Sequence, residues 1–351
     1  MASALYPPLG LDDFHFDSMD TTEDITYYFP GGYHPIVIGD VLSPSGENSE
    51  SGSRQYRIMH KLGYGSYSTV WLAQKTDSSE TFVAVKVAMA EDDLTREVAM
   101  LKAASKFQTN DGRPSHFLNI LDYFTLHGPN GSHFVLVTEI VVSLSSLLSL
   151  KCPQLWHKTV AHGLAQAVAN LHSAGIIHGG MSSVSSLFFV ADPPLDLHIG
   201  NVGFAIPQIA GQDAHDIMQY LGPYDITIIV PKSAANQTPS LPAYVLAPSN
   251  LVRYYNRIAG KDLPQIKIFD FGTGELLFST QDCILTHLPA HEIGTHPLNF
   301  QCAVEACAPE LAFAQAVEKI DNPPVEPPAD VWALGAAVSR ILHPLVPGAD
   351  L

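Results

Sequence analysis

The sequence predicts an α+β fold with two lobes, in which a small β-rich lobe precedes a larger, mainly helical lobe. Two observations support this prediction. Segments rich in β-branched and aromatic residues dominate the first half of the chain, whereas apolar residues at helical spacing mark much of the second half. With 351 residues, the chain is long enough to give each lobe an apolar core.

The first lobe is predicted to consist of five strands and one helix. Leu94, Val98 and Leu101 recur three to four residues apart, and acidic residues precede them, as is typical of a helix N-terminus. Strands are predicted at residues 56–63, 69–74, 81–88, 120–127 and 133–141. The longest helix of the second lobe is marked by Val160, Leu164, Val168 and Leu171.

Composition divides the chain into three parts. Residues 1–55 hold nine acidic residues and one Arg, so an acidic, largely disordered leader is predicted, although residues 31–42 are apolar enough to pack on the first lobe. The first lobe is expected over residues 56–140 and the second over residues 141–351. Within the second lobe, residues 205–265 are rich in proline and lack periodicity, which favours an inserted, loop-rich segment.

Charge and segment lengths exclude several classes of partner. The net charge of −17 argues against a nucleic-acid backbone as the main partner and favours a basic one. The most apolar stretch, residues 134–150, is short and contains Glu139, so a strand that leads into a helix is favoured over a membrane span. Neither a signal peptide nor a zinc or disulfide pattern among the four cysteines is visible. The expected location is the cytoplasm and/or the nucleus, and a monomer is also expected.

A glycine turn and a lysine in an apolar strand predict a phosphate site. Gly63 and Gly65 lie between two predicted strands, where backbone N–H groups can approach a phosphate closely. Lys86 lies inside the apolar strand that follows, where an ammonium group is costly to bury unless it is paired. Glu97 on the predicted helix is the expected partner. The simpler alternatives are a hairpin glycine and a surface lysine.

A third chemical feature follows much later in the chain. In IKIFDFGTGE (residues 266–275), Asp270 lies between an apolar strand and a glycine turn, and such a carboxylate can hold Mg²⁺ on a nucleotide. DFG alone also fits an ordinary turn. CAPEL at residues 307–311 and PPADVWALGAAVSRIL at residues 327–342 come after it.

As an ordered set, these motifs resemble those of the eukaryotic protein kinases. The resemblance covers roughly residues 56–342 and implies the two-lobed protein kinase fold. GGYHPIVIGDVL (residues 31–42), Ser68 in the place of a third glycine, and the long spacer at residues 205–265 are similar to the SR-protein kinases. These kinases phosphorylate serines in Arg/Ser-rich proteins.

The resemblance implies an ATP- and Mg²⁺-dependent serine/threonine kinase with basic Arg/Ser-rich substrates. Lys86, oriented by Glu97, would hold the α/β-phosphates, and Asp196 would be the catalytic base. Asn201 and Asp270 would bind Mg²⁺. The nucleotide would contact Leu62, Gly63, Gly65, Val70, Ala84, Lys86, Glu139 and Ile140.

The catalytic loop of this family, H-x-D-L-x-x-x-N, is interrupted here. His178 and Gly179 fit its start, and residues 196–201, DLHIGN, fit the rest, with residues 180–195 between them. We interpret residues 180–195 as a translated, in-frame intron, since their removal gives IIHGDLHIGN. A genuine insertion stays open as the alternative. If the loop instead continues directly after His178, both metal-facing positions are lost and the chain is an ATP-binding pseudokinase.

The C-lobe is also expected to be incomplete, because kinase C-lobes continue well beyond the helix that starts at Asp330. Six apolar residues of that helix would then lose much of their cover, namely Val331, Trp332, Leu334, Val338, Ile341 and Leu342.

Overall fold

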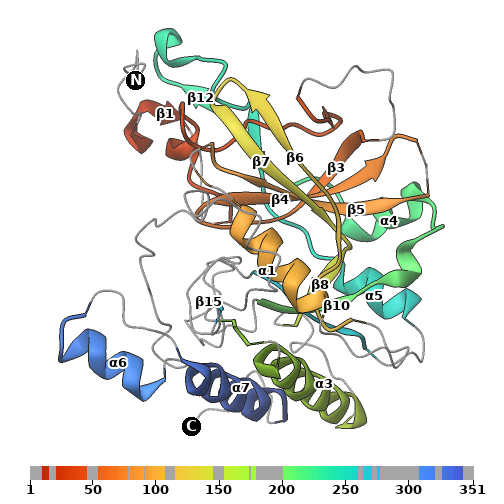
Figure 1. Ribbon diagram of the computed structural model, residues 1–351. Coiled ribbons are helices and arrows are strands. Elements are labelled where there is room, and N and C mark those ends of the chain that lie inside the picture. Colours follow the sequence, from red (N-terminus) through yellow and green to blue (C-terminus); the bar gives the residue numbers. More distant parts are fainter. Residues whose placement is uncertain are drawn as a thin grey trace, which may run out of the picture.

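The computed structural model places a twisted antiparallel sheet above a pair of packed helices, α3 (Gln154–Ser173) and α7 (Pro327–Leu342) (Figure 1). The expected α+β fold with a sheet-rich N-terminal region is therefore confirmed. The structure describes residues 10–15, 21–45, 54–77, 80–90, 92, 94–106, 115–144, 154–173, 175–178, 201–259, 264–270, 275–276, 308–320 and 326–342. The insert at residues 180–195, Asp196 and the four cysteines lie outside these ranges.

The upper lobe in Figure 1 is the first lobe predicted from the sequence. It is built on a six-stranded antiparallel sheet in the order β2-β3-β4-β5-β7-β6. Alternate residues of these β-branched strands face the two sides of the sheet, so both sides carry an apolar layer. All five strands predicted for this lobe are confirmed. The strands are β2 (Val41–Leu42), β3 (Tyr56–Tyr64), β4 (Ser68–Lys75), β5 (Phe82–Ala88), β6 (Ile120–Gly128) and β7 (Gly131–Thr138).

Helix α1 (Thr95–Lys106) packs below this sheet, on the side that faces the lower lobe (Figure 1). Leu94 and Val98 contact the apolar cluster around Leu136 of β7, and Leu101 joins the main core. The predicted helical face is thus buried. It brings Glu97, whose residue is only 3% exposed, to the inner side of the sheet.

The lower lobe combines helices with short strands. β8 (Val141–Ser143), β10 (Val202–Ala205) and β14 (Ile266–Ile268) form a sheet in the order β14-β10-β8. β9 (Ile176–Ile177) pairs with β15 (Glu275–Leu276). The main apolar core runs through this lobe and continues into the inner layer of the upper sheet, so the two lobes share one core.

Helix α7 is covered on one side by α3 and faces α6 (Pro309–Ala316) across an apolar hollow. Ile341 is fully buried, and Leu334 and Val338 are partly buried against the main core. Val331, Trp332 and Leu342 are 40–53% exposed. Three of the six apolar residues named for this helix are thus exposed, while α3 and the main core cover the other three.

Residues 21–30 of the predicted disordered leader, and not only the segment 31–42, pack on the upper lobe. Ile25, Tyr28 and Tyr33 are buried together with Met89 of the upper lobe. Strand β2 then pairs with β3, as expected for the segment 31–42. The acidic composition of the whole leader hides this local aromatic run, which has enough apolar surface to be worth burying.

The spacer at residues 205–265 is more regular than its composition predicts. It contains α4 (Ala214–Leu221), β11 (Ile226–Ile228), β12 (Val230–Pro231), β13 (Tyr244–Leu246) and α5 (Val252–Ile258). Its two helices pack on the main core, while its middle part climbs the upper lobe and returns (Figure 1).

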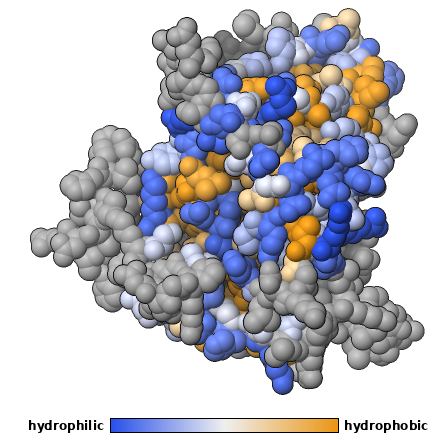
Figure 2. Space-filling view, turned by 90° about the vertical axis from the view of Figure 1, so that its right-hand side faces the viewer, coloured by the Kyte–Doolittle hydropathy of each residue, from blue (hydrophilic) through white to orange (hydrophobic). Residues whose placement is uncertain are grey.

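The middle of the spacer covers the outer side of the upper sheet together with the leader. Leu246 packs in the same cluster as Trp71 and Val85, and β12 pairs with β1 (Phe14–His15) of the leader. Residues that lack periodicity in sequence are thus ordered by surfaces from two other parts of the chain. The right-hand side of the molecule, shown in Figure 2, carries apolar side chains in several separate patches rather than in one continuous surface.

Candidate active site

The site is centred on Lys86, which lies in the middle of β5 between Val70 of β4 and Leu136 of β7. Its Nζ lies 2.7 Å from Oε2 of Glu97 on α1. On the other side, Nζ lies 3.9 Å from Oδ1 of Asp270, which follows β14 of the lower lobe. The structure therefore brings together three residues that the sequence spreads over 185 positions.

The electrostatics of this trio keep the ammonium group charged. Burial alone lowers the pKa of Lys86, but the carboxylates of Glu97 and Asp270 outweigh it and raise that pKa above its usual value. Burial raises the pKa of Glu97, and Lys86 opposes this shift. The Lys86 ammonium group thus lies between two carboxylates. This arrangement suits a pocket that takes up a second cation together with an anionic ligand.

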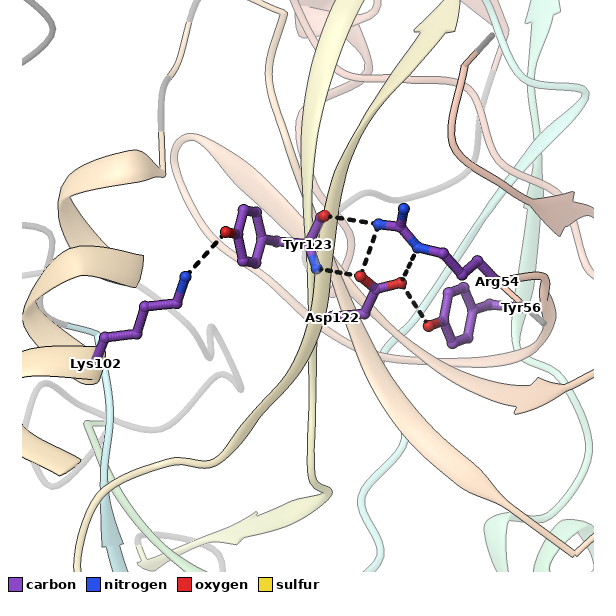
Figure 3. A network of polar contacts seen from close by, with 5 residues as sticks. All are labelled: Arg54, Tyr56, Lys102, Asp122 and Tyr123. Atoms are coloured by element: carbon purple, nitrogen blue, oxygen red, sulfur yellow. Dashed lines mark hydrogen bonds and ion pairs between the residues drawn. The ribbon is translucent and has the colours of Figure 1, made fainter. Parts of the chain in front are cut away.

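Helix α1 is held against the sheet by a polar network at its C-terminal half (Figure 3). Lys102 of α1 donates to the hydroxyl of Tyr123 on β6 (2.9 Å). The neighbouring Asp122 accepts two hydrogen bonds from Arg54 (2.8 and 2.9 Å) and one from the hydroxyl of Tyr56 (2.8 Å). Burial raises the pKa of Asp122, but these hydrogen bonds outweigh it and lower the pKa overall. The helix that carries Glu97 is therefore tied to β6, and Asp122 ties β6 in turn to β3.

Asp270 adopts a backbone conformation that is rare for a residue with a side chain. Its φ is +64°, in the left-handed region, which costs about 1–2 kcal/mol in a non-glycine residue. The strain is retained because β14 fixes the preceding residues and the chain must turn to present the carboxylate to Lys86. Strained residues of this kind are concentrated at functional sites.

The two halves of the interrupted motif meet on one residue, Phe269. Nε2 of His178 lies 3.0 Å from the Phe269 carbonyl oxygen, and the Phe269 N–H donates to the Asn201 carbonyl (3.0 Å). His178 and Asn201 are both fully buried. Residues 179–200, including Asp196, lie outside the described residues, so the position of Asp196 stays a prediction.

The start of helix α7 fixes the first half of this motif. Asp330 is fully buried and accepts a hydrogen bond from the His178 N–H (2.8 Å). Nε2 of His172, near the end of α3, lies 3.1 Å from the same carboxylate. The sequence singled out the DVWALG segment without predicting that its aspartate anchors His178.

The glycine turn connects β3 to β4. Gly63 pairs with Val70 across the hairpin, and the Gly65 N–H donates to the Ser68 carbonyl (2.7 Å). Leu62, Val70 and Ala84 belong to the inner layer of the sheet and to the core that continues into the lower lobe. The structure thus places the predicted nucleotide contacts of β3, β4 and β5 on the face that carries Lys86.

The connection between the lobes runs through Glu139 and Ile140. Oε1 of Glu139 lies 2.7 Å from Nζ of Lys267 on β14 and accepts from the Asn119 N–H (2.7 Å). Ile140 is buried, and its carbonyl accepts from the Ile206 N–H (3.2 Å). The Glu139 side chain thus supports the connection between the lobes.

Lys267 was missed in the sequence, although the signal was present. Like Lys86, it interrupts an apolar strand, and its residue is only 4% exposed. It also donates to the Phe117 carbonyl (3.2 Å), so it joins β14 to the segment before β6 and to the interlobe connection. A buried lysine in a strand predicts a partner, but the sequence does not show that the partner is Glu139.

The two lobes share one core, a strand lysine is paired with a helix glutamate, and an aspartate follows a strand of the lower lobe. Together, these features define a protein-kinase-like chain. No family model matches the sequence. The curated proteins that it resembles are SR-protein kinases and related serine/threonine kinases, so the chain is SR-protein kinase-like.

Three relatives illustrate the similarity. Serine/threonine-protein kinase spk-1 of Caenorhabditis elegans is 31% identical over 182 residues, which is 48% of this chain and 16% of the relative. Protein kinase dsk1 of Schizosaccharomyces pombe is 32% identical over 167 residues (44% and 29%). Human SRSF protein kinase 3 is 30% identical over 198 residues (52% and 31%). The aligned part of this chain therefore spans less than a third of the length of each of these relatives.

In the described part of the chain, no cluster of three or more His, Cys, Asp or Glu side chains could hold a metal ion. Among the described helices, none combines the length and apolarity that a membrane span requires.

Proposed function

We propose that the chain is an ATP-dependent serine/threonine protein kinase that phosphorylates serines in Arg/Ser-rich proteins. The observation that carries the proposal is the ion pair of Lys86 with Glu97, with Asp270 on the opposite side of the ammonium group. Similarity to proteins named as serine/threonine and SRSF protein kinases supports it.

In this proposal, Lys86 binds the α/β-phosphates of ATP and Glu97 orients it. The Gly63–Gly65 turn covers the phosphates, and the adenine lies against Leu62, Val70 and Ala84, next to the connection at Glu139 and Ile140. Positioning and charge stabilisation supply most of the catalysis in phosphoryl transfer, so the rigidity of α1 and β5 is what the reaction requires.

The residues present fit Mg²⁺. Asp270 offers a carboxylate and Asn201 an amide oxygen, which are hard oxygen ligands of the kind that Mg²⁺ prefers. The hydrogen bond between Phe269 and Asn201 joins the segment that carries Asp270 to the segment that carries Asn201. Bound Mg²⁺ would neutralise charge on the phosphates. Asp196 would accept the hydrogen bond of the substrate hydroxyl and align it for attack.

Charge as well as similarity to SRSF protein kinases supports this substrate class. The net charge of −17 complements a basic Arg/Ser-rich segment and favours fast association with it. We propose that the protein acts as a monomer in the cytoplasm and/or the nucleus.

One observation favours a second candidate, an ATP-binding pseudokinase or scaffold. His178 and Asn201 flank 22 residues, whereas the kinase motif allows only six between these two positions. A group that must be placed to within about 1 Å is easily displaced by such an excursion. ATP binding needs only Lys86, the glycine turn and the apolar face, so binding can persist without transfer.

The two candidates separate in one pair of measurements. Mg-ATP is added to the chain in a thermal unfolding assay, and transfer of labelled phosphate to an Arg/Ser-repeat peptide is measured in parallel. Kinase activity predicts a raised Tm together with serine phosphorylation. A raised Tm without transfer supports the pseudokinase, and no shift and no transfer contradict both.

A further inference from the structure

The glycine turn is held from outside by a residue of the leader. The hydroxyl of Tyr33 donates a hydrogen bond to the carbonyl oxygen of Gly65 (2.5 Å), across 32 positions in sequence. Both groups are buried, and the residue Tyr33 is 3% exposed. Leader and turn therefore meet through a specific polar contact as well as through apolar packing.

Tyr33 is itself held by two backbone hydrogen bonds and by an aromatic contact. Its N–H donates to the Tyr27 carbonyl (2.9 Å), and its carbonyl accepts from Nδ2 of Asn130 (2.5 Å). Its ring lies against the ring of Tyr28, with the centroids 5.5 Å apart. Burial raises the pKa of Tyr33, so the hydroxyl keeps its proton and remains a donor near neutral pH.

The contact completes the restraint of Gly65. The Gly65 N–H already bonds to Ser68, and Tyr33 now satisfies its carbonyl, so both polar groups of this peptide segment are oriented. Beyond it, Ser66 and Tyr67 are exposed, and the Tyr67 carbonyl accepts from the Met89 N–H (2.8 Å). The tip of the turn thus lies between two residues that are held by hydrogen bonds, Gly65 and Tyr67.

We propose that Tyr33 is a positioning residue for nucleotide binding, which sets the height of the Gly63–Gly65 turn over the phosphates through its hydrogen bond to the Gly65 carbonyl. This inference rests on the proposed function. A turn that is already placed loses less conformational freedom when a nucleotide binds, so the hydrogen bond favours binding without touching the ligand. The leader then contributes to the nucleotide-binding site.

The test compares Tyr33→Phe with a matched control, Tyr56→Phe. Tyr56 is equally buried, its hydroxyl also makes one hydrogen bond, and it lies at the opposite end of β3 from the turn. Asp122 keeps its Arg54 partner in the control, and Lys102 keeps its bond to Tyr123, so α1 stays in place. The two variants lose similar interactions and differ in whether the turn is released.

Two quantities are measured for each variant and for the unsubstituted chain: the Kd for Mg-ADP, and amide hydrogen exchange in residues 62–68 without nucleotide. In Tyr33→Phe, we expect the Kd to rise about fivefold, as the loss of one buried hydrogen bond allows, and exchange to accelerate in this segment. In Tyr56→Phe, we expect both quantities to stay within twofold of the unsubstituted chain.

Unchanged Kd and exchange in Tyr33→Phe overturn the inference, and so does an equal rise of the Kd in both variants. If the unsubstituted chain binds no Mg-ADP, the proposed function fails, and with it the role of Tyr33 in binding. In that case, faster exchange in Tyr33→Phe alone still establishes that Tyr33 restrains the turn, so the two failures are distinguishable.

Discussion

Glu23 of the leader and Lys61 of β3 form an ion pair that is almost completely buried, since their side chains are 1% and 0% exposed. The hydroxyl of Tyr28 donates to the second carboxylate oxygen of Glu23 (2.6 Å), and the Lys61 ammonium lies over the rings of Tyr64 and Trp71. Lys61 stands two residues before Gly63, so this pair and the Tyr33 contact attach the leader to the same strand and turn.

The first prediction concerns this pair. Glu23→Gln keeps an acceptor for Tyr28 but leaves the buried Lys61 charge without its counter-ion, so the free energy of unfolding should fall by about 3 kcal/mol. Burial already lowers the pKa of Lys61 and Glu23 opposes this, so the deficit should shrink as the pH rises towards 10. Urea unfolding at pH 7 and pH 9.5 measures both effects.

Adding Lys61→Met to Glu23→Gln removes the stranded charge and should restore most of the lost stability. The control is Lys75→Met, which breaks the exposed pair with Asp77 and should change stability by less than about 1 kcal/mol. A double variant that is less stable than Glu23→Gln contradicts the assignment.

The second prediction concerns Lys86. Lys86→Met should abolish phosphate transfer by any active form, because it removes the charge contact to the nucleotide. The fold should be retained, since burial raises the pKa of Glu97 and a proton can replace the missing ammonium partner. Circular dichroism and a transfer assay test the two halves. Lys75→Met at the end of β4, which breaks the exposed pair with Asp77, is the control, and equal turnover in the Lys86 variant and the unsubstituted chain contradicts the role of Lys86.

The third prediction concerns residues 180–195. Their removal joins Gly179 to Asp196 and should raise phosphate transfer at least about a hundredfold, because the catalytic carboxylate is then held between His178 and Asn201. Both of these residues already bond to Phe269, beside Asp270. Transfer to an Arg/Ser-repeat peptide is measured for the excised and original chains.

The matched control is the excised chain with Asp196→Asn, which should lose the gain. Equal rates in the excised and original chains would show that the insert is a harmless loop. Mg-ATP binding without transfer in both chains would establish the pseudokinase.

The fourth prediction concerns pH. Burial, and then the neighbouring His133, lower the pKa of His34 to about 4, and the two rings lie 4.8 Å apart. The unfolded chain therefore binds a proton at His34 below pH 6.5 that the folded chain excludes, so this contribution is complete above pH 6.5 and is lost as the pH falls towards 4. Between pH 7 and pH 5, His34 should account for about 2 kcal/mol of lost stability at most.

The measurement compares the unsubstituted chain with His34→Gln in urea at both pH values. Between pH 7 and pH 5, the free energy of unfolding of the variant should fall by up to about 2 kcal/mol less than that of the unsubstituted chain. An identical pH dependence of the two proteins contradicts the role of His34.

The sequence by itself determined the strands and helix of the upper lobe and the residue types of the site. Val, Ile and aromatic residues in short runs have few alternatives to a sheet, and a lysine inside such a run requires an acidic partner. Lys86, Glu97 and Asp270 could therefore be named in advance. Their roles, and the place of Asp196, stay predictions.

Only the tertiary structure decided what surrounds the site. Contacts such as Tyr33 with Gly65 and Glu139 with Lys267 join residues 32 to 128 positions apart, and local periodicity carries no information about such pairs. The leader and the spacer read as disordered or irregular because neither can bury its apolar residues alone. Each becomes ordered on the outer side of the same sheet, where the other segment and the strands supply the missing surface.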